Sequence, residues 1–258
     1  MFSRPKFGWI ASHPGKTAIL VCLNTVLFLV FSATEISAQK RFSRTFPAGQ
    51  NIRLQLINRS GTVTVEGWDR QEVSVTASLE APTAVITPQT IDGTILINLV
   101  RDNQGREVGN VNFNIRVPVT SSVDIETLIG NLTVSNVRGG LVRAHISSEG
   151  DIELTNIAAF QVTAQNGIGD IFFDGEMLSG GNYRFASLRG NINLRIPFTS
   201  SFKLVATAPS TRNISLGSFS NGGMNYLGDG RRVVGKFGDG NSTLSVTNQR
   251  GSISFIRR

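Results

Sequence analysis

The sequence predicts an all-β fold: a right-handed parallel β-solenoid with coils of about 20 residues and an irregular meander near its N-terminal end. Three observations predict it: a composition that favours short strands, an alternation of apolar and polar residues, and glycines that recur at a nearly constant step. A β-sandwich is the alternative, because short alternating strands joined by turns describe that fold too.

The composition is the first of these observations. The chain has 258 residues, enough for one large or two small domains, and 27 of them are glycine. It is rich in Val, Ile, Ser, Thr and Asn and poor in long helix formers. Such a balance is typical of many short strands joined by tight turns, and no long helix is expected after the N-terminal segment.

Residues 1–38 differ from the rest and have the layout of a signal peptide. Arg4, Lys6 and Lys16 precede an apolar run at 17–33, and a short polar stretch that includes Ala38 follows it. We therefore predict either a signal peptide cleaved after Ala38 or an uncleaved N-terminal anchor. In both cases the remainder is exported to the periplasm, the cell surface or the medium, and only the anchor would attach it to a membrane.

Charge and cysteine content limit the chemistry of residues 39–258. Removal of the leader leaves 22 Lys and Arg against 17 Asp and Glu, a net charge of +5 (25 − 3 and 18 − 1), and the chain's one cysteine, Cys22, is lost. Burial and backbone hydrogen bonds, and not disulfides, must therefore stabilise the domain. The basic residues are scattered and form no run, so no nucleic-acid partner is predicted.

A repeated unit is the strongest signal in residues 39–258, which we interpret as a single all-β repeat domain. Each unit has two apolar positions two residues apart, a polar turn, a glycine, and two more apolar positions two apart, as in Val123, Ile125, Gly130, Leu132 and Val134. The corner glycines of the successive units are Gly61, Gly130, Gly150, Gly169, Gly190 and Gly251. In the middle of the chain their step is close to twenty residues. A longer echo agrees, because RVPVTSSV at 116–123 returns as RIPFTSSF at 195–202, an offset of 79.

The physics of the unit explains its residues. Alternation turns one face of each strand inward, and the glycine allows a positive φ at the corner. A unit of this size cannot bury its apolar face alone, so neighbouring units must stack. Residues 66–118 break the rhythm, with strands expected at 72–78, 94–100 and 111–117, and form the predicted meander.

Several segments resemble a bacterial family of unknown function that is labelled "putative adhesin". The resemblance lies in SGTVTVEGWD at 60–69, VSV at 73–75, IRVP at 115–118 and the segment from FGDG at 237–240 to Ile253. It covers most of residues 45–258 and implies a β-solenoid-like domain in exported or membrane-attached proteins, with no catalytic residues to transfer. The chain departs from the pattern at Arg212, which stands where a corner glycine is expected.

Candidate catalytic residues are few, and we predict that the protein is not an enzyme. Only two histidines occur, His13 in the leader and His145, whose apolar neighbours Ala144 and Ile146 indicate that it points outward from a strand. Asp151 and Asp170 follow equivalent corner glycines and could bind a cation or act as a carboxylate pair. Asn131 and Asn191 hold the same position in flanking units, which favours a turn-forming role.

Two further features have a structural and a functional interpretation. Trp68 could stack on a sugar or cover the edge of the core. The triplets at 228–230 and 238–240, both Gly-Asp-Gly, could be ion-binding loops or tight turns, and neither extends to a complete calcium or phosphate motif. We predict no catalytic, cofactor-binding or metal-binding residue and no cofactor.

Together these features favour a non-catalytic, exported cell-envelope protein that acts as a rigid adhesive or scaffolding surface. Its expected partners are a glycan, an envelope protein or a second copy of itself. The alternatives are a polysaccharide-active β-helix enzyme and a membrane-anchored periplasmic accessory or sensor domain.

Overall fold

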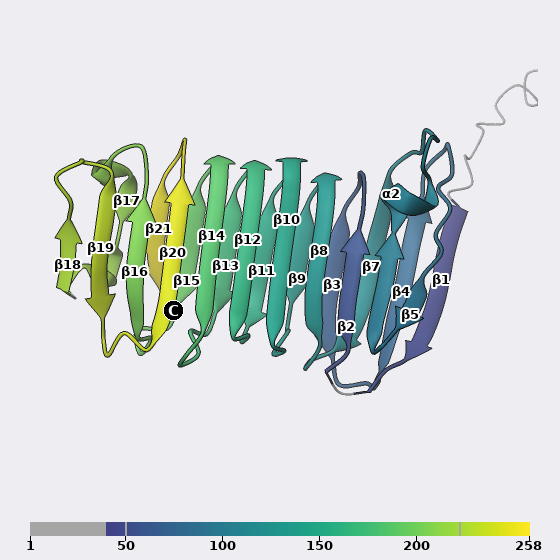
Figure 1. Cartoon of the computed structure of the whole chain (residues 1–258), viewed down its shortest axis with the longest axis horizontal. Helices are drawn as coiled ribbons and strands as arrows, with labels where there is room; N and C mark the ends of the chain where they lie inside the picture. Colours follow the sequence, from purple (N-terminus) through teal and green to yellow (C-terminus); the bar gives the residue numbers. More distant parts are fainter. Residues whose placement is uncertain (1–39, 50, 222) are drawn as a thin grey trace, which may run out of the picture. The chain divides into compact units, whose positions relative to one another are not determined.

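Two large β-sheets face each other across one hydrophobic core in the computed structural model, which describes residues 40–49, 51–221 and 223–258 (Figure 1). The predicted signal peptide or anchor at 1–38 lies outside the described residues. Among the described residues, no helix is both long and apolar enough to cross a membrane.

The first sheet has ten strands and the second has eleven. In spatial order the first sheet contains β1 (Lys40–Pro47), β4 (Glu72–Leu79), β7 (Val111–Pro118), β3 (Val63–Trp68), β9 (Leu132–Ser135), β11 (Ile152–Ile157), β13 (Ile171–Gly175), β15 (Ile192–Ile196), β21 (Ile253–Arg257) and β17 (Ile214–Ser215). The second contains β18 (Gly223–Tyr226), β19 (Arg232–Phe237), β16 (Phe202–Thr207), β20 (Ser242–Asn248), β14 (Asn182–Arg189), β12 (Gln161–Ile168), β10 (Leu141–Glu149), β8 (Ser122–Ile129), β2 (Arg53–Ile57), β6 (Thr94–Asn98) and β5 (Gln89–Ile91). A short α2 (Leu99–Asp102) and the 3-10 turns η1 (Thr211–Asn213) and η2 (Gly217–Asn221) complete the described elements.

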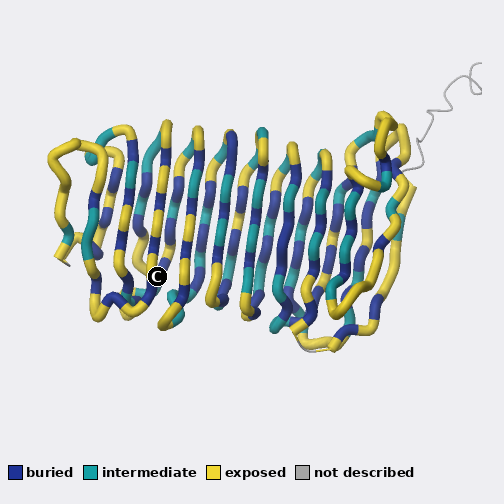
Figure 2. The backbone as a smooth tube through the Cα atoms, in the orientation of Figure 1, coloured by how far each residue is buried: buried dark blue, intermediate teal, exposed yellow. Residues whose placement is uncertain are grey.

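Alternation along each strand decides which side chains enter the core. On β10, Val142, Ala144 and Ile146 are fully buried, while Arg143 and His145 between them face outward. The same pattern recurs along nearly every strand, so that dark and light segments alternate in Figure 2. Period-two burial on both sheets produces a two-layered core of aliphatic side chains.

In the middle of the domain, from β8 to β15, successive strands alternate between the two sheets. Each strand pairs in parallel with the strand about twenty residues away in the sequence, so that Val123, Val142, Val162 and Tyr183 are aligned across β8, β10, β12 and β14. Equivalent apolar residues are therefore neighbours within the sheet, and they pack into the core that this sheet shares with the other one.

The predicted parallel β-solenoid is wrong, because both sheets are mixed. Antiparallel pairs join β1 to β4, β4 to β7, β5 to β6, β16 to β19 and β18 to β19. The arrangement is sandwich-like, which agrees with the β-sandwich that the sequence offered as the alternative. Alternation specifies which face of a strand is buried, and it is the same for a strand in a stacked coil and for one in a layered sandwich.

The order of the strands also departs from consecutive stacking. In the second sheet β20 lies between β14 and β16, and in the first sheet β21 lies between β15 and β17. The last two strands of the chain, β20 and β21, therefore each lie between two strands that come earlier in the sequence. At the other end, β3 lies between β7 and β9. Short repeats carry no information on this order, because any strand with the same inward residues can occupy the same slot.

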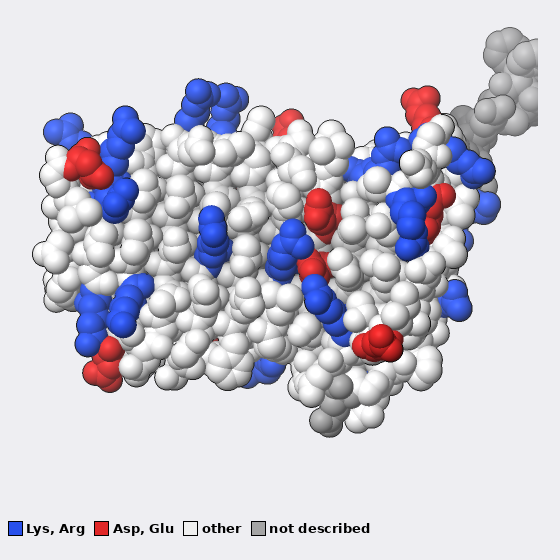
Figure 3. Space-filling model, viewed as in Figure 1, with Lys and Arg blue, Asp and Glu red and all other residues white. Residues whose placement is uncertain are grey.

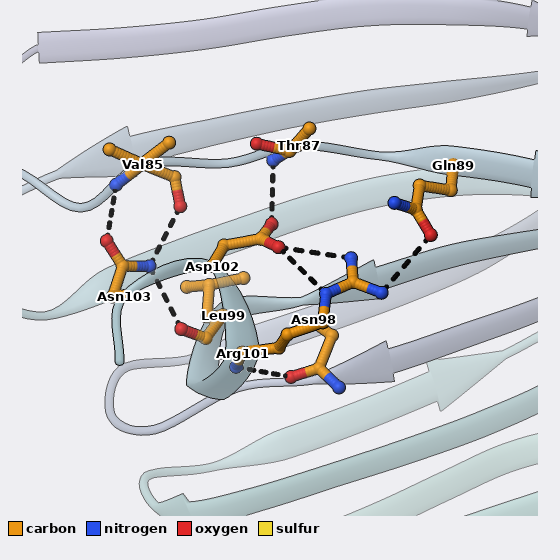
Figure 4. A network of polar contacts seen from close by, with 8 residues as sticks. All are labelled: Val85, Thr87, Gln89, Asn98, Leu99, Arg101, Asp102 and Asn103. Carbon is orange, nitrogen blue, oxygen red and sulfur yellow. Dashed lines mark hydrogen bonds and ion pairs between the residues drawn. The ribbon is translucent and has the colours of Figure 1, made fainter. Parts of the chain in front are cut away.

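A polar network holds the irregular segment before β7 (Figure 4). The strand predicted at 94–100 ends at Asn98, whose Oδ1 accepts the N–H of Arg101 at 2.9 Å and begins α2. The buried Asn103 bonds both backbone groups of Val85, and Asp102 accepts the N–H of Thr87. The loop before β5 is therefore fixed by side chains and not by a strand ladder.

Aromatic side chains fill the core where β20 and β21 are inserted. Phe219 lies 5.0 Å from Phe237 and 5.9 Å from Phe202, measured between ring centroids, and Phe255 is within 6.3 Å of Phe202. Phe219 comes from η2, so the 3-10 turn contributes an anchor to the core. Edge-to-face and offset contacts at these distances stabilise the cluster beyond simple area burial.

Candidate functional site

The candidate corner carboxylates form part of a ladder of backbone hydrogen bonds. The Oδ1 of Asn131 accepts the N–H of Asp151 at 3.0 Å, and the Oδ1 of Asp151 accepts the N–H of Asp170 at 2.8 Å. The Oδ1 of Asp170 then accepts the N–H of Asn191 at 2.6 Å, and that of Asn191 accepts the N–H of Ser252 at 3.2 Å. The structure thus brings Asp151 and Asp170 together and uses each as the acceptor for the next corner.

A column of glycines runs beside this ladder. At Gly130, Gly150, Gly169 and Gly190 the backbone φ is between 115° and 148°. A Cβ atom at Gly150 would overlap the carbonyl oxygen of Gly130, and each of the next glycines has the same relation to the one before it. Glycine is therefore required at these corners both for the positive φ and for the close approach of the backbones.

Polar side chains at the inward position before two of the corners complete the turn. Asn166 donates from Nδ2 to the carbonyl of Gly150, and Asn248 does the same to Gly190, both at 2.7 Å. Both asparagines are about 95% buried or more. Asn166 and Asn248 were not predicted from the sequence, although both follow two inward apolar positions in their units, a pattern that indicates an inward polar residue.

A charged cluster lies on the outer face of the second sheet, over β2, β8 and β10. Asp124, with a side chain only 6% exposed, accepts from Arg53 at 2.6 Å and from Arg143 at 2.9 Å. Arg143 also lies 3.7 Å from Glu126, whose Oε1 is 4.0 Å from the Nδ1 of His145. Figure 3 shows acidic and basic side chains side by side on this face. The cluster was not predicted from the sequence, because its members come from β2, β8 and β10 and meet only through the pairing of these strands.

A second acidic group is paired in the same way on the first sheet. Asp174 lies 3.4 Å from Arg195 and 3.6 Å from Arg258, and its side chain is 13% exposed. Both buried carboxylates are therefore neutralised by two arginines each. Among the described residues, no group of three His, Cys, Asp or Glu side chains is arranged to hold a metal ion.

The remaining sequence candidates are engaged in local contacts. The indole N–H of Trp68 donates to the carbonyl of Glu72, and the guanidinium carbons of Arg70 and Arg116 lie 5.1 Å and 5.6 Å from its ring centre. Asp229 accepts the N–H groups of Arg231 and Arg232 and closes a turn. At Arg212, which stands where a corner glycine was expected, the chain forms η1 instead of a glycine corner.

A cleft of about 230 Å³ opens next to the charged cluster, over β10, β12, β14 and β20. His145 lies on its border, on the outward face as alternation predicts. The cleft is lined by His145, Ile146, Ser147, Gln165, Asn166, Gly167, Ala186, Ser187, Leu188, Thr247 and Gln249. Apart from His145 none of these side chains is ionisable, whereas three other clefts on the described residues each include an arginine.

Two residues at this cleft carry buried polar atoms without a hydrogen bond, the Oδ1 of Asn166 and the Nδ1 of His145. Asn166 occupies an inward position of β12, and the Nδ1 of His145 faces Glu126 of the charged cluster at 4.0 Å. The polar lining of the cleft itself therefore consists of its outward hydroxyl and carboxamide groups.

Comparison with known proteins gives structural matches only. No protein-family model matches the chain, and no curated protein matches it. A "putative cell adhesion protein" from Clostridium sporogenes matches 85% of this chain and all of its own, with 11% identity and a TM-score of 0.48. A "putative adhesin" from Bacteroides fragilis matches 85% of this chain and 98% of its own, with 10% identity and a TM-score of 0.39.

A third match is a "putative lipid binding protein" from Parabacteroides distasonis, which covers 84% of this chain and 97% of its own at 10% identity and a TM-score of 0.34. Similarity at this level carries no conclusion about what the chain binds. One of these structures carries the name "putative adhesin", which is also the label of the family that the sequence motifs resemble, and another is named "putative cell adhesion protein".

Proposed function

We propose that the chain is a non-catalytic, exported cell-envelope protein whose paired sheets present a rigid adhesive or scaffolding surface. The observation that carries this proposal is the structural use of its acidic side chains. The corner carboxylates Asp151 and Asp170 accept backbone N–H groups, and Asp124 and Asp174 are each held by two arginines. General acid and base catalysis needs such groups free to exchange a proton with a substrate.

The rigidity of the surface supports the same proposal. Strands β8, β10, β12 and β14 each pair on both sides, and their inward side chains share one continuous core. Segments with many buried contacts and fully paired backbones open only at a high free energy. Outward side chains on these strands are therefore held at fixed spacings, which suits repeated contacts with an extended partner.

The enzyme alternative depends on the pair Asp151 and Asp170. In a polysaccharide-active enzyme these carboxylates would have to protonate or attack a glycosidic bond. In the structure both carboxylates instead accept backbone N–H groups of the next corner, which is a structural role.

A combined binding and turnover experiment tests the proposal. The immobilised chain is exposed to cell-envelope material from its source organism, and in parallel it is incubated with neutral and acidic polysaccharides while reducing ends are measured. We expect retention of envelope material and no increase in reducing ends. Turnover that disappears in Asp151→Ala or Asp170→Ala would contradict the proposal, and so would failure to retain any envelope component.

Export is tested separately by mass spectrometry of the N-terminal peptide from cells that produce the full chain. A start at Gln39 in the exported fraction is the expected result for a cleaved signal peptide. An intact leader in the membrane fraction would favour the anchored accessory protein, and an intact leader in the cytoplasm would contradict export.

A further inference from the structure

The cleft over β10, β12, β14 and β20 has the chemistry of a ligand site, an inference that rests on the proposed function and deepens it. We propose that this cleft binds an uncharged, hydroxyl-rich saccharide. Its walls carry hydroxyl groups on Ser147 and Thr247 and carboxamides on Gln165 and Gln249. These groups both donate and accept hydrogen bonds, as sugar hydroxyls do, and no fixed charge among them would select an ion.

The geometry of the row across the cleft fits an extended ligand. His145, Gln165, Ala186 and Thr247 occupy one aligned row on the outward faces of four parallel-paired strands. With neighbouring strands roughly 4.8 Å apart, the row spans about 14 Å from first to last residue. Ala186 has the smallest side chain in this row and forms its low point, and Leu188 beside it is 53% exposed and offers an apolar surface for the C–H face of a sugar ring.

A β-bulge lies beside the cleft. On β10 the pairing register shifts between Ile146 and Glu149 relative to both neighbouring strands. Ser147 lies within this bulge and is part of the lining of the cleft. Bulges of this kind re-aim side chains and are frequent next to binding sites.

The polar contacts of the cleft come from outward side chains. Gln165 and Thr247 occupy outward positions of β12 and β20, and each can both donate and accept a hydrogen bond. Asn166 occupies an inward position and uses its Nδ2 for the carbonyl of Gly150, so it belongs to the corner. The Nδ1 of His145 faces Glu126 at 4.0 Å, which connects this end of the cleft to the charged cluster.

The position of the cleft favours a saccharide over a peptide. Extended peptides bind β-proteins mainly by adding a strand to an open sheet edge. All four strands beneath the cleft are interior, with β8 beyond β10 and β16 beyond β20, so their backbone groups are already paired. A ligand here must be recognised mainly by side chains, and the hydroxyl and carboxamide groups of the lining can bond to sugar hydroxyls.

The test is a titration of the purified full chain with four neutral polysaccharides (dextran, laminarin, mannan and amylose) and with anionic alginate. Binding is followed by calorimetry, and the ring protons of His145 are followed by NMR. We expect at least one neutral polysaccharide to bind and to shift the His145 signals, with alginate weaker. Stronger binding of alginate, or binding of none of the neutral probes, overturns the proposal.

Variants locate the site. Ala186→Tyr should fill the cleft and weaken binding by roughly tenfold or more, while a tyrosine on an outward strand position leaves the fold intact. Gln165→Ala and Thr247→Ala should also weaken binding. Their matched controls, Thr163→Ala on β12 and Ser245→Ala on β20, face outward on the same strands but lie outside the cleft and should bind as the unchanged chain does.

The same variants separate this inference from the proposed function. If Ala186→Tyr and the unchanged chain retain envelope material and polysaccharide equally, the cleft assignment fails while the surface function stands. If the unchanged chain retains no envelope material at all, the proposed function fails, whatever the polysaccharide titration gives.

Discussion

The backbone N–H of Asp170 donates a 2.8 Å hydrogen bond to the Oδ1 of Asp151, the residue at the equivalent corner one repeat earlier. One side chain thus connects two neighbouring corners at a point where the strand ladder is interrupted. This relationship explains why Asn or Asp follows the corner glycine in four successive units, because both provide an acceptor oxygen at the same distance from the backbone.

Replacement of Asp151 tests the ladder. In Asp151→Ala the N–H of Asp170 loses its acceptor, and we expect the free energy of unfolding to fall by about 1 kcal/mol. Asp151→Asn keeps an acceptor oxygen and should stay within about 0.5 kcal/mol of the unchanged chain. Urea denaturation measures both. An equal loss in the two variants would show that the negative charge, and not the hydrogen bond, matters.

The glycine column has a sharper prediction. Gly169 has φ of 130°, and a Cβ there would overlap the carbonyl of Gly150, so Gly169→Ala should destabilise the fold by more than about 2 kcal/mol. Gly180→Ala is the control, because Gly180 also has a positive φ, 79°, but has open space around it. Its cost should be limited to roughly 1–2 kcal/mol of backbone strain. Thermal unfolding measures the stability of both variants. An equal loss of stability in the two would show that the contact with the carbonyl of Gly150 does not matter.

The charged cluster around Asp124 predicts a measurable coupling. Asp124 is shielded and held by Arg53 and Arg143, so Asp124→Asn should lower the free energy of unfolding by roughly 1–3 kcal/mol. In a double-mutant cycle with Arg143→Gln the two losses should be non-additive by about 1 kcal/mol. The exposed pair of Arg70 with Glu72, 3.5 Å apart, serves as the control and should show almost no coupling. Additive losses at Asp124 would contradict a structural role for the pair.

Tyr183 predicts how stability responds to alkaline pH. Its hydroxyl accepts the N–H of Leu178 at 2.7 Å and donates to the carbonyl of Ala159 at 3.0 Å. Burial of the side chain raises the pKa of Tyr183 above its ordinary value of 10.0. The unfolded chain therefore releases this proton first, and the contribution of Tyr183 is complete below pH 10.0 and is lost as the pH rises toward the folded-state pKa.

Tyr183→Phe should lower stability at neutral pH by roughly 1–3 kcal/mol and flatten the alkaline decline. Tyrosinate absorbance provides a direct check, because the chain has two tyrosines and Tyr226→Phe leaves Tyr183 as the only one. In that variant the folded chain should form tyrosinate at a higher pH than the chain unfolded in urea. Tyrosinate formation at the same pH in both states would refute the shift.

Part of the fold could be predicted from the sequence because it depends on neighbours along the chain. The strands expected at 72–78 and 111–117 are found as β4 and β7, and alternation places Ala144 and Ile146 inside and His145 outside. The strand expected at 94–100 instead ends at Asn98, where a side-chain cap begins α2. A local hydrogen bond there outweighed the apolar alternation.

The sequence by itself determined the all-β class, the burial of each strand's inner face and the need for glycine and Asx residues at the corners, since these follow from period-two alternation and backbone sterics. Only the tertiary structure decided the order and direction of the strands, including the insertion of β20 between β14 and β16 and the antiparallel pairs at both ends. The physical reason is that strands with similar inward residues can replace one another in a sheet, so the choice depends on contacts between distant segments, such as the packing of Phe219 against Phe237 and Phe255. The same is true of the saccharide cleft, whose residues come from four strands and meet only through their register.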